Sequence, residues 1–135
     1  MTYDEKIKWL RRYRASLEEE QILALELEQV KTEAAHITPL FSDAPGGQGG
    51  QDKLPKAVER ILETQQHLQA QINHTHAVRA EIATAINAVP NADGRKILRR
   101  KYLLGQHWET IACNIYKSYR ATTRLHRKTV EKMEI

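Results

Sequence analysis

The chain has 135 residues, of which 41% are hydrophobic and only 6% are aromatic, and its formal net charge is +4. This length allows one compact domain, or a small domain with an elongated helical part. Its single cysteine, Cys113, excludes an intramolecular disulfide framework, and no apolar run approaches the roughly 20 residues of a membrane-spanning helix. Because the N-terminus also lacks a signal-peptide core, we expect a cytoplasmic protein without a membrane partner.

The charge is distributed unevenly along the sequence. Residues 1–94 hold 10 Lys/Arg against 14 Asp/Glu, a net charge of −4, whereas residues 95–135 hold 11 against 3, a net charge of +8. A segment this basic indicates a polyanionic partner, and we favour nucleic acid over the alternative of a solvated basic face.

Residues 1–37 predict one long helix, because they contain no Pro or Gly and are rich in Glu, Leu, Lys, Gln and Arg. A phase slip near residues 18–20 divides the helix into two halves, each with coiled-coil spacing. The apolar positions are Ile7, Leu10, Tyr13 and Leu17, then Leu23, Leu27, Val30, Ala34 and Ile37.

Residues 38–53 contain Pro39, Pro45 and four of the six glycines, and they predict a flexible loop. The glycines lack the Lys-Ser/Thr that a phosphate-binding loop requires at its end.

Residues 54–89 predict a second long helix with a cleaner heptad pattern. Its seam steps by four and three residues through Leu54, Val58, Ile61, Gln65, Leu68, Ile72, Thr75, Arg79, Ile82, Ile86 and Val89. The two helices would form a long antiparallel hairpin, a coiled coil closed by the Gly/Pro-rich loop. Because a two-helix seam leaves apolar side chains such as Ile22, Leu25 and Leu62 exposed, we expect a homodimer.

Residues 90–94 predict a turn, after which residues 95–135 form a basic module of three short helices. The first runs from Arg95 to Leu104 and ends at Gly105, a good left-handed cap. The second spans residues 107–114 with Trp108 as its core anchor, and the third begins at the N-cap Ser118. The chain is therefore expected to be all-α, with a helical hairpin followed by a C-terminal helix-turn-helix.

The third helix of this module has the pattern of a helix that reads the DNA major groove. Thr122, Leu125, Thr129 and Val130 have the spacing of a buried stripe. The opposite face is predicted to contact double-stranded DNA, because arginine pairs bidentately with guanine and cations neutralise phosphates. This face consists of Tyr119, Arg120, Thr123, Arg124, Arg127 and Lys128, with supporting phosphate contacts expected from Arg99, Arg100 and Lys117.

The sequence resembles a family of small phage and prophage proteins of Gram-positive bacteria. The resemblance is carried by Ile111-Ala112, by residues 116–120 and 123–126, and by residues 41–47 followed by Asp52-Lys53. These proteins have a helix-turn-helix similar to region 4 of sigma-70 factors, and include late-gene activators of the ArpU and RinA types. The resemblance implies a phage-encoded transcriptional regulator without catalytic activity, acting in the host bacterial cytoplasm. It implies promoter-reading roles for Tyr119, Arg120, Ala121, Thr123 and Arg124.

Two rival functions remain open. One is a small terminase-like DNA-packaging subunit, which also combines a helix-turn-helix with a coiled-coil oligomer. The other is an adaptor that contacts RNA polymerase through the acidic hairpin. We expect neither an enzyme nor a bound cofactor or metal, since the sequence contains no nucleophile–base pair or cofactor fingerprint, and His67, His74 and His76 are poorly spaced for chelation.

Overall fold

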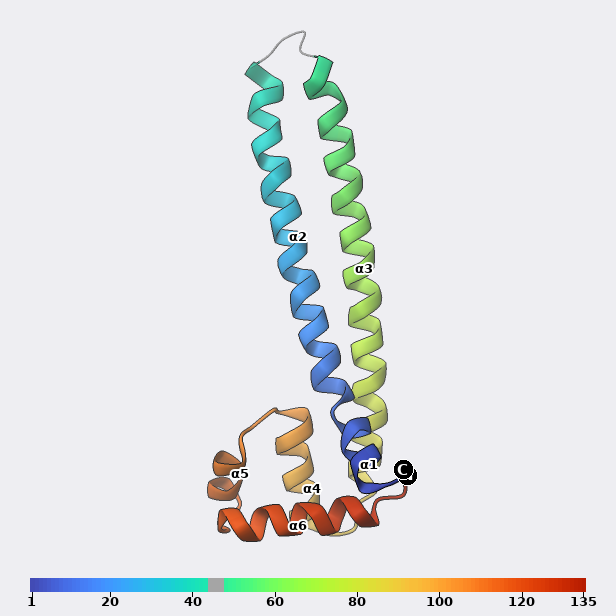
Figure 1. The fold of residues 1–135 in the computed structure, drawn as a ribbon, viewed down its shortest axis with the longest axis vertical. Helices are drawn as coiled ribbons and strands as arrows, with labels where there is room; N and C mark the ends of the chain where they lie inside the picture. The colour runs from blue at the N-terminus through green and yellow to red at the C-terminus, as the bar shows by residue number, and fades with distance from the viewer. Residues whose placement is uncertain (44–47) are drawn as a thin grey trace. The chain divides into compact units, whose positions relative to one another are not determined.

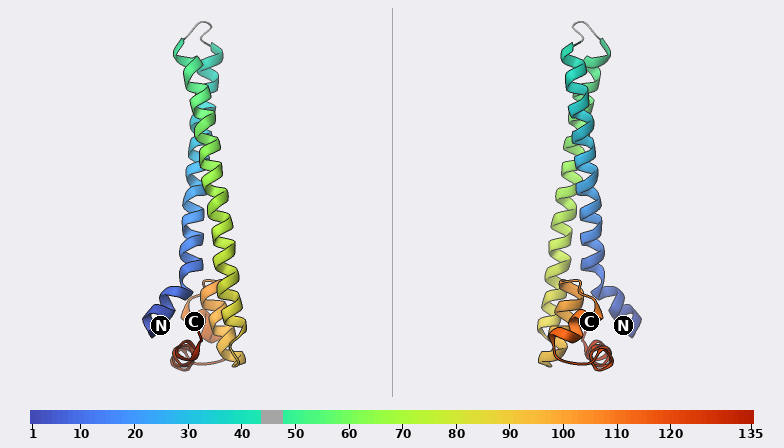
Figure 2. Two further views of the ribbon diagram at one scale, coloured as in Figure 1. Left: turned by 90° about the vertical axis from the view of Figure 1, so that its right-hand side faces the viewer. Right: turned by 90° about the vertical axis from the view of Figure 1, so that its left-hand side faces the viewer.

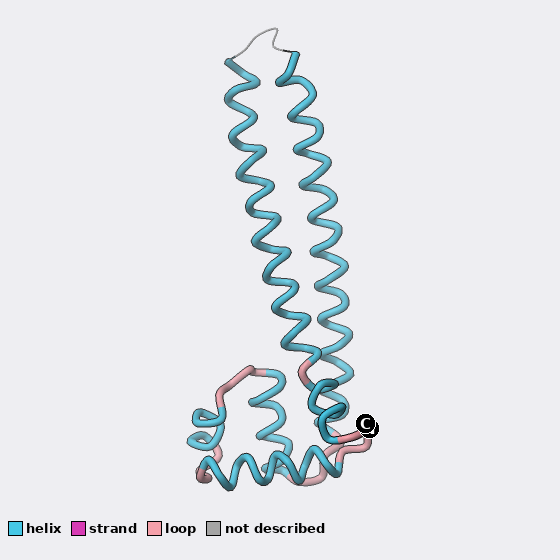
Figure 3. Tube along the Cα trace, viewed as in Figure 1, coloured by secondary structure: helices cyan, strands magenta, loops and turns pink. Residues whose placement is uncertain are grey.

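A computed structural model of the chain describes the backbone of residues 1–43 and 48–135 and the side chains of residues 1–37 and 53–135 (Figure 1). All the regular structure in these described residues is helical, as expected, and the connections between helices are short (Figure 3). The chain divides into two compact units. The terminal unit contains Met1–Leu17 and His74–Ile135, and the central unit contains Glu18–Asn73.

The first helix differs from its prediction, because it breaks at Arg11 into α1 (Tyr3–Leu10) and α2 (Arg12–Asp43). Helix α1 begins with a capping box, in which the Thr2 hydroxyl accepts from the Glu5 amide and the Glu5 carboxylate accepts from the Thr2 amide. At the break, the Arg12 guanidinium donates to the carbonyl of Trp9 at 3.1 Å. This side-chain donor satisfies a backbone acceptor beside the break, and neither Pro nor Gly marks the position in the sequence.

The predicted loop at residues 38–53 is also corrected. Helix α2 continues to Asp43, and α3 (Gln48–Asn87) begins before the expected start at Leu54 and carries Pro55 inside it. A proline removes one helical hydrogen bond, but it does not prevent the helix from continuing on both sides. Residues 44–47, the remainder of the expected loop, lie outside the described residues.

In the central unit, α2 and α3 lie side by side and antiparallel (Figures 1 and 2). The seam of α3 differs from its prediction at Val58, Gln65 and Arg79, which are exposed, whereas the other predicted seam residues have low exposure. Ala57 is buried, whereas Val58 is 46% exposed and Gln65 is exposed. At this point the seam contains the small Ala57 instead of the larger Val58 that follows it. The expected polar seam residue Gln65 is not buried.

The phase slip predicted near residues 18–20 is not a break in the burial pattern. Residues of low exposure recur along α2 at steps of three and four. These residues include Tyr13, Ser16, Glu20, Leu23, Leu27, Val30, Ala34 and Ile37. The polar Ser16 and Glu20 were not part of the predicted apolar pattern. An unbroken heptad spacing is what a left-handed coiled coil requires.

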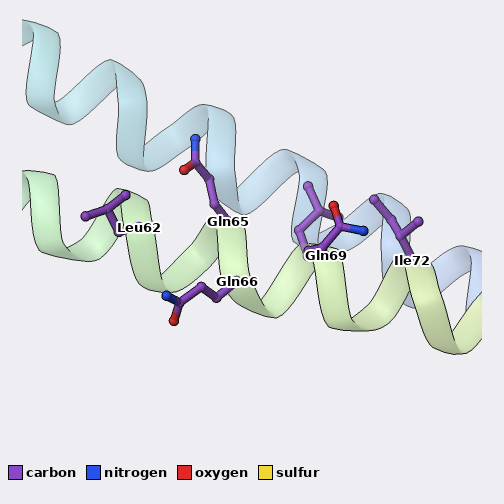
Figure 4. Close-up of a pocket in the computed structure, with 6 residues that line it drawn as sticks. Leu62, Gln65, Gln66, Gln69 and Ile72 are labelled. Atoms are coloured by element: carbon purple, nitrogen blue, oxygen red, sulfur yellow. The ribbon is translucent and has the colours of Figure 1, made fainter.

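Apolar side chains remain on the outside of the central unit, as the sequence predicted. Leu25 is 71% exposed, and Ile22 and Leu62 are each about half exposed. Leu62, Gln65 and Ile72 also line a shallow groove of about 430 Å³ along α3 (Figure 4). Two helices alone therefore leave apolar surface in contact with water.

The terminal unit has the larger apolar core. Leu10, Ile82, Ile86, Leu98 and Val130 are completely buried in one cluster, which α1, α3 and the C-terminal helices share. In the same unit, the buried Ser16 and Thr75 hydroxyls lie 3.1 Å apart in a hydrogen bond. Arg79, another expected seam residue, is exposed.

The expected turn at residues 90–94 is mostly helical. Helix α4 (Ala92–Leu98) begins at the N-cap Asn91, whose side chain accepts from the Gly94 amide at 2.8 Å. It continues into a π-helical turn, η1 (Arg99–Leu103), and the segment ends at Gly105, whose φ of +68° is the left-handed conformation predicted there. The basic module thus begins at Ala92.

Candidate nucleic-acid interface

Two helices and a tight connection form the candidate interface within the terminal unit. Helix α5 (Trp108–Asn114) is followed by α6 (Tyr119–Lys132), and the Ser118 hydroxyl accepts from the Ala121 amide at 3.1 Å, which confirms the predicted N-cap. The connection contains Tyr116, which has a φ of +58° and is 96% exposed. A left-handed backbone is unusual for a bulky residue, and the sequence alone did not predict it.

The buried side of α6 anchors it beneath α4 and α5. Thr122, Thr129 and Val130 are buried as predicted, but Leu125 is half-buried and His126 takes the central inward position. The spacing of 122, 126, 129 and 130 is that of one helix face. The sequence analysis assigned His126 to neither face of this helix and therefore missed its burial.

His126 lies between two aromatic side chains that hold it in place. Its Nε2 is 2.7 Å from the Tyr102 hydroxyl, and its ring meets the Trp108 ring edge-on with the ring centroids 4.7 Å apart. Burial, together with the positive charges of Lys101 and Arg11, lowers the pKa of His126 to about 4. The imidazole is therefore neutral at pH 7, and α6 is anchored without a charge in its core.

Trp108, the predicted core anchor, is only half-buried, so it shares this role with the buried residues of α5. One side of its ring packs on His126, and the Lys101 ammonium lies 4.8 Å from its centroid. The buried apolar residues of α5 are Ile111 and Ala112.

The outward side of α6 carries the residues predicted to contact DNA. Arg120, Arg124 and Lys128 are exposed, and none of them forms a side-chain hydrogen bond or ion pair with the described part of the chain. Tyr119 is about half exposed, and the Thr123 hydroxyl donates to the carbonyls of Tyr119 and Arg120 at 3.2 Å. Three cations at helical spacing are thus free to meet a ligand.

Arg127 differs from its neighbours because it already has partners. Its Nε donates to a Glu131 carboxylate oxygen at 2.9 Å, and its guanidinium lies 4.5 Å from the centroid of the Tyr3 ring. Helix α1 also holds the end of α6, since the Lys6 ammonium donates to the carbonyls of Glu131 and Met133 at 2.9 and 2.8 Å. Arg127 is therefore the one arginine or lysine of the predicted face on α6 that is already engaged within the described residues, whereas Arg120, Arg124 and Lys128 remain open.

The three supporting cations predicted from the sequence also have partners within the terminal unit. Arg99 donates to the Asn87 side-chain oxygen at 2.5 Å, and Arg100 donates to the Gln106 side-chain oxygen at 3.1 Å. Lys117 forms a looser ion pair with Asp93 at 3.7 Å. Arg99 and Lys117 remain accessible at the surface, and of the two only Lys117 has a carboxylate partner within the described residues.

A groove of about 960 Å³ runs along this side of α6, and part of its lining consists of residues that the sequence analysis did not assign to DNA binding. Besides Arg120, Thr123, Arg124, Arg127 and Lys128, it is lined by Tyr3, Asp4, Ile7, Arg11, Lys101, Tyr102, Trp108, His126 and Glu131. Arg11 and Lys101 come from the end of α1 and from η1. Their proximity to α6 depends on tertiary packing, so helical periodicity could not have revealed it.

Other kinds of site find little support in the described residues. There, no three His, Cys, Asp or Glu side chains are grouped to hold a metal ion, and no helix has the length and apolarity to cross a membrane. Cys113 is exposed and unpaired by any disulfide. In comparisons with known proteins, no family model matches the chain, and neither do any curated proteins or solved structures.

Proposed function

We propose that this protein is a sequence-specific DNA-binding transcriptional regulator that reads duplex DNA with α6. In this proposal α5, the connection through Tyr116 and α6 act as a helix-turn-helix, with α6 in the major groove. The observation that carries it is the exposure of Arg120, Arg124 and Lys128 without acidic partners among the described residues. The resemblance to phage regulators with a sigma region 4-like module supports the same function.

The two ends of α6 would have different tasks. Arg120 and Arg124 lie toward the N-terminus, where a reading helix meets base edges and arginine pairs with guanine O6 and N7. Lys128 lies one turn further and would meet phosphate. The neutral anchor at His126 and the N-cap at Ser118 fix the helix before DNA arrives, so little ordering remains to oppose binding.

Single substitutions test this division. Arg120→Ala and Arg124→Ala should each cost about 1–3 kcal/mol of binding free energy and relax the sequence preference, whereas Lys128→Ala should weaken all sequences alike. Gel shifts of the full chain with a selected and a random duplex measure both effects. Glu134→Ala, at an exposed acidic position beyond α6, is the control. If all three basic variants lost the same affinity for both duplexes, the contact would be purely electrostatic and base reading would be disproved.

A further inference from the structure

The groove beside α6 has a second set of cations opposite the predicted reading face. Arg11 is exposed at the end of α1, Lys101 is half-buried in η1, and both line the groove together with Arg120 and Arg124. Six cationic side chains line the groove against two carboxylates, Asp4 and Glu131. Glu131 is already paired with Arg127, so the groove holds a clear excess of positive charge.

The positive charges of Arg11 and Lys101 repel each other, and neither side chain forms an ion pair with the described residues. The pKa of Lys101 is lowered, first by burial and then by the charge of Arg11, while Glu109 raises it only partly. The Lys101 ammonium is held instead over the Trp108 ring. Two like charges that line one groove favour an anion that neutralises both.

We propose that Arg11 and Lys101 form a phosphate-binding site for the backbone of the same duplex whose bases α6 reads. This inference rests on the proposed function and adds to it two residues outside the helix-turn-helix. A phosphodiester is favoured over an acidic peptide, because the groove is continuous with the free cations of α6 and backbone contacts commonly fix the register of a reading helix. Helix α1, which is also held to the end of α6 through Lys6, thereby becomes part of the DNA-binding surface.

Charge-removing variants of the full chain test the site. Arg11→Gln removes one charge, and Lys101→Met removes the other while keeping an apolar stem against Trp108. The matched controls are Lys8→Gln, exposed on α1, and Lys96→Gln, exposed on α4; neither residue lines the groove. Affinities for a selected and a random duplex are measured between 50 and 200 mM salt by fluorescence anisotropy, and thermal unfolding checks each fold.

Each groove variant should weaken binding to both duplexes by a similar factor, about three- to tenfold, and should lower the slope of log K against log salt by about 0.9. The controls should keep the wild-type slope. Groove variants that behave like the controls, while Arg120→Ala still loses its preference, would overturn this inference and leave the proposed function standing. Weaker binding to poly-glutamate with unchanged DNA affinity would instead assign the groove to an acidic protein. A wild-type chain that binds no duplex would overturn the proposed function and this inference with it.

Discussion

His126 shows how one residue can set the properties of the proposed interface. A histidine on a helix rich in Arg and Lys has the polarity of a surface residue, although its spacing from Thr122, Thr129 and Val130 places it on the buried face. Its position depends on the Tyr102 hydroxyl and the Trp108 ring, which reach it from η1 and α5. By contrast, the Ser118 cap and the Gly105 turn were predictable, because each depends on local backbone chemistry alone.

The buried His126 predicts a loss of stability in mild acid. The pKa of this residue is about 4 in the folded chain and about 6.5 in the unfolded chain. Between these values the unfolded chain binds a proton that the folded chain does not, so stability is complete above pH 6.5 and decreases as the pH falls toward 4. The loss should reach at most about 3 kcal/mol.

Urea unfolding followed by tryptophan fluorescence measures this effect, because Trp9 and Trp108 both belong to the terminal unit. His126→Phe keeps an aromatic ring beside Trp108 and should flatten the dependence between pH 7 and pH 5. His67→Gln, at an exposed position of α3, should leave it unchanged. A wild-type dependence that survives in His126→Phe would contradict the assignment.

At the scale of elements, the sequence predicted the helices better than their packing phase. Heptad spacing in α3 correctly selected Ile61, Leu68 and Thr75 as positions of low exposure. It failed between Ala57 and Val58, because a scale of apolarity prefers valine whereas the seam holds the smaller residue. Neither Pro nor Gly occurs at the break at Arg11 or within the π-helical turn at η1, so residue type did not indicate either feature.

Close packing of α4 on α6 gives a prediction at the same scale. A Cβ atom at Gly94 would lie 2.7 Å from the Thr129 Oγ1, and this hydroxyl already donates to the Leu125 carbonyl. Alanine normally stabilises a helix interior relative to glycine, but overpacking costs about 1–3 kcal/mol. Gly94→Ala should therefore lower the free energy of unfolding.

The double variant Gly94→Ala/Thr129→Ala supplies the control, because removing the hydroxyl and methyl groups of Thr129 makes room for the added carbon. In a double-mutant cycle measured by urea unfolding, Gly94→Ala should cost less in the Thr129→Ala background than in the wild type. An equal cost in both backgrounds would show that the contact does not limit the approach of the two helices.

At the scale of the whole molecule, the sequence predicted an all-helical chain and an exposed apolar surface. It also placed the free cations of α6 on one helix face. It could not predict that Arg127 packs against Tyr3, or that Arg11 joins the groove, because the residues in each case are about a hundred positions apart. Such contacts follow from the packing of α1 on α6, which depends on the complete fold.

Exposed apolar side chains in the central unit predict self-association. Ile22, Leu25 and Leu62 should be covered in a homodimer, so sedimentation equilibrium at tens of micromolar should give twice the chain mass of 15.6 kDa. Leu25→Gln combined with Leu62→Gln should give a monomer of unchanged helicity, and Glu63→Gln should not. A monomeric wild type would disprove the dimer, and a ring of many subunits would favour a DNA-packaging role.

The most direct test of DNA reading by α6 is a selection of duplexes from a random-sequence pool by the full chain. The recovered sequence is then measured against unselected DNA at physiological salt. The account predicts one recurrent sequence, bound at least about 10³-fold more tightly than random duplex, and a preference that falls in Arg120→Ala and Arg124→Ala. A pool that remains unenriched, with no duplex bound even at low ionic strength, would contradict it.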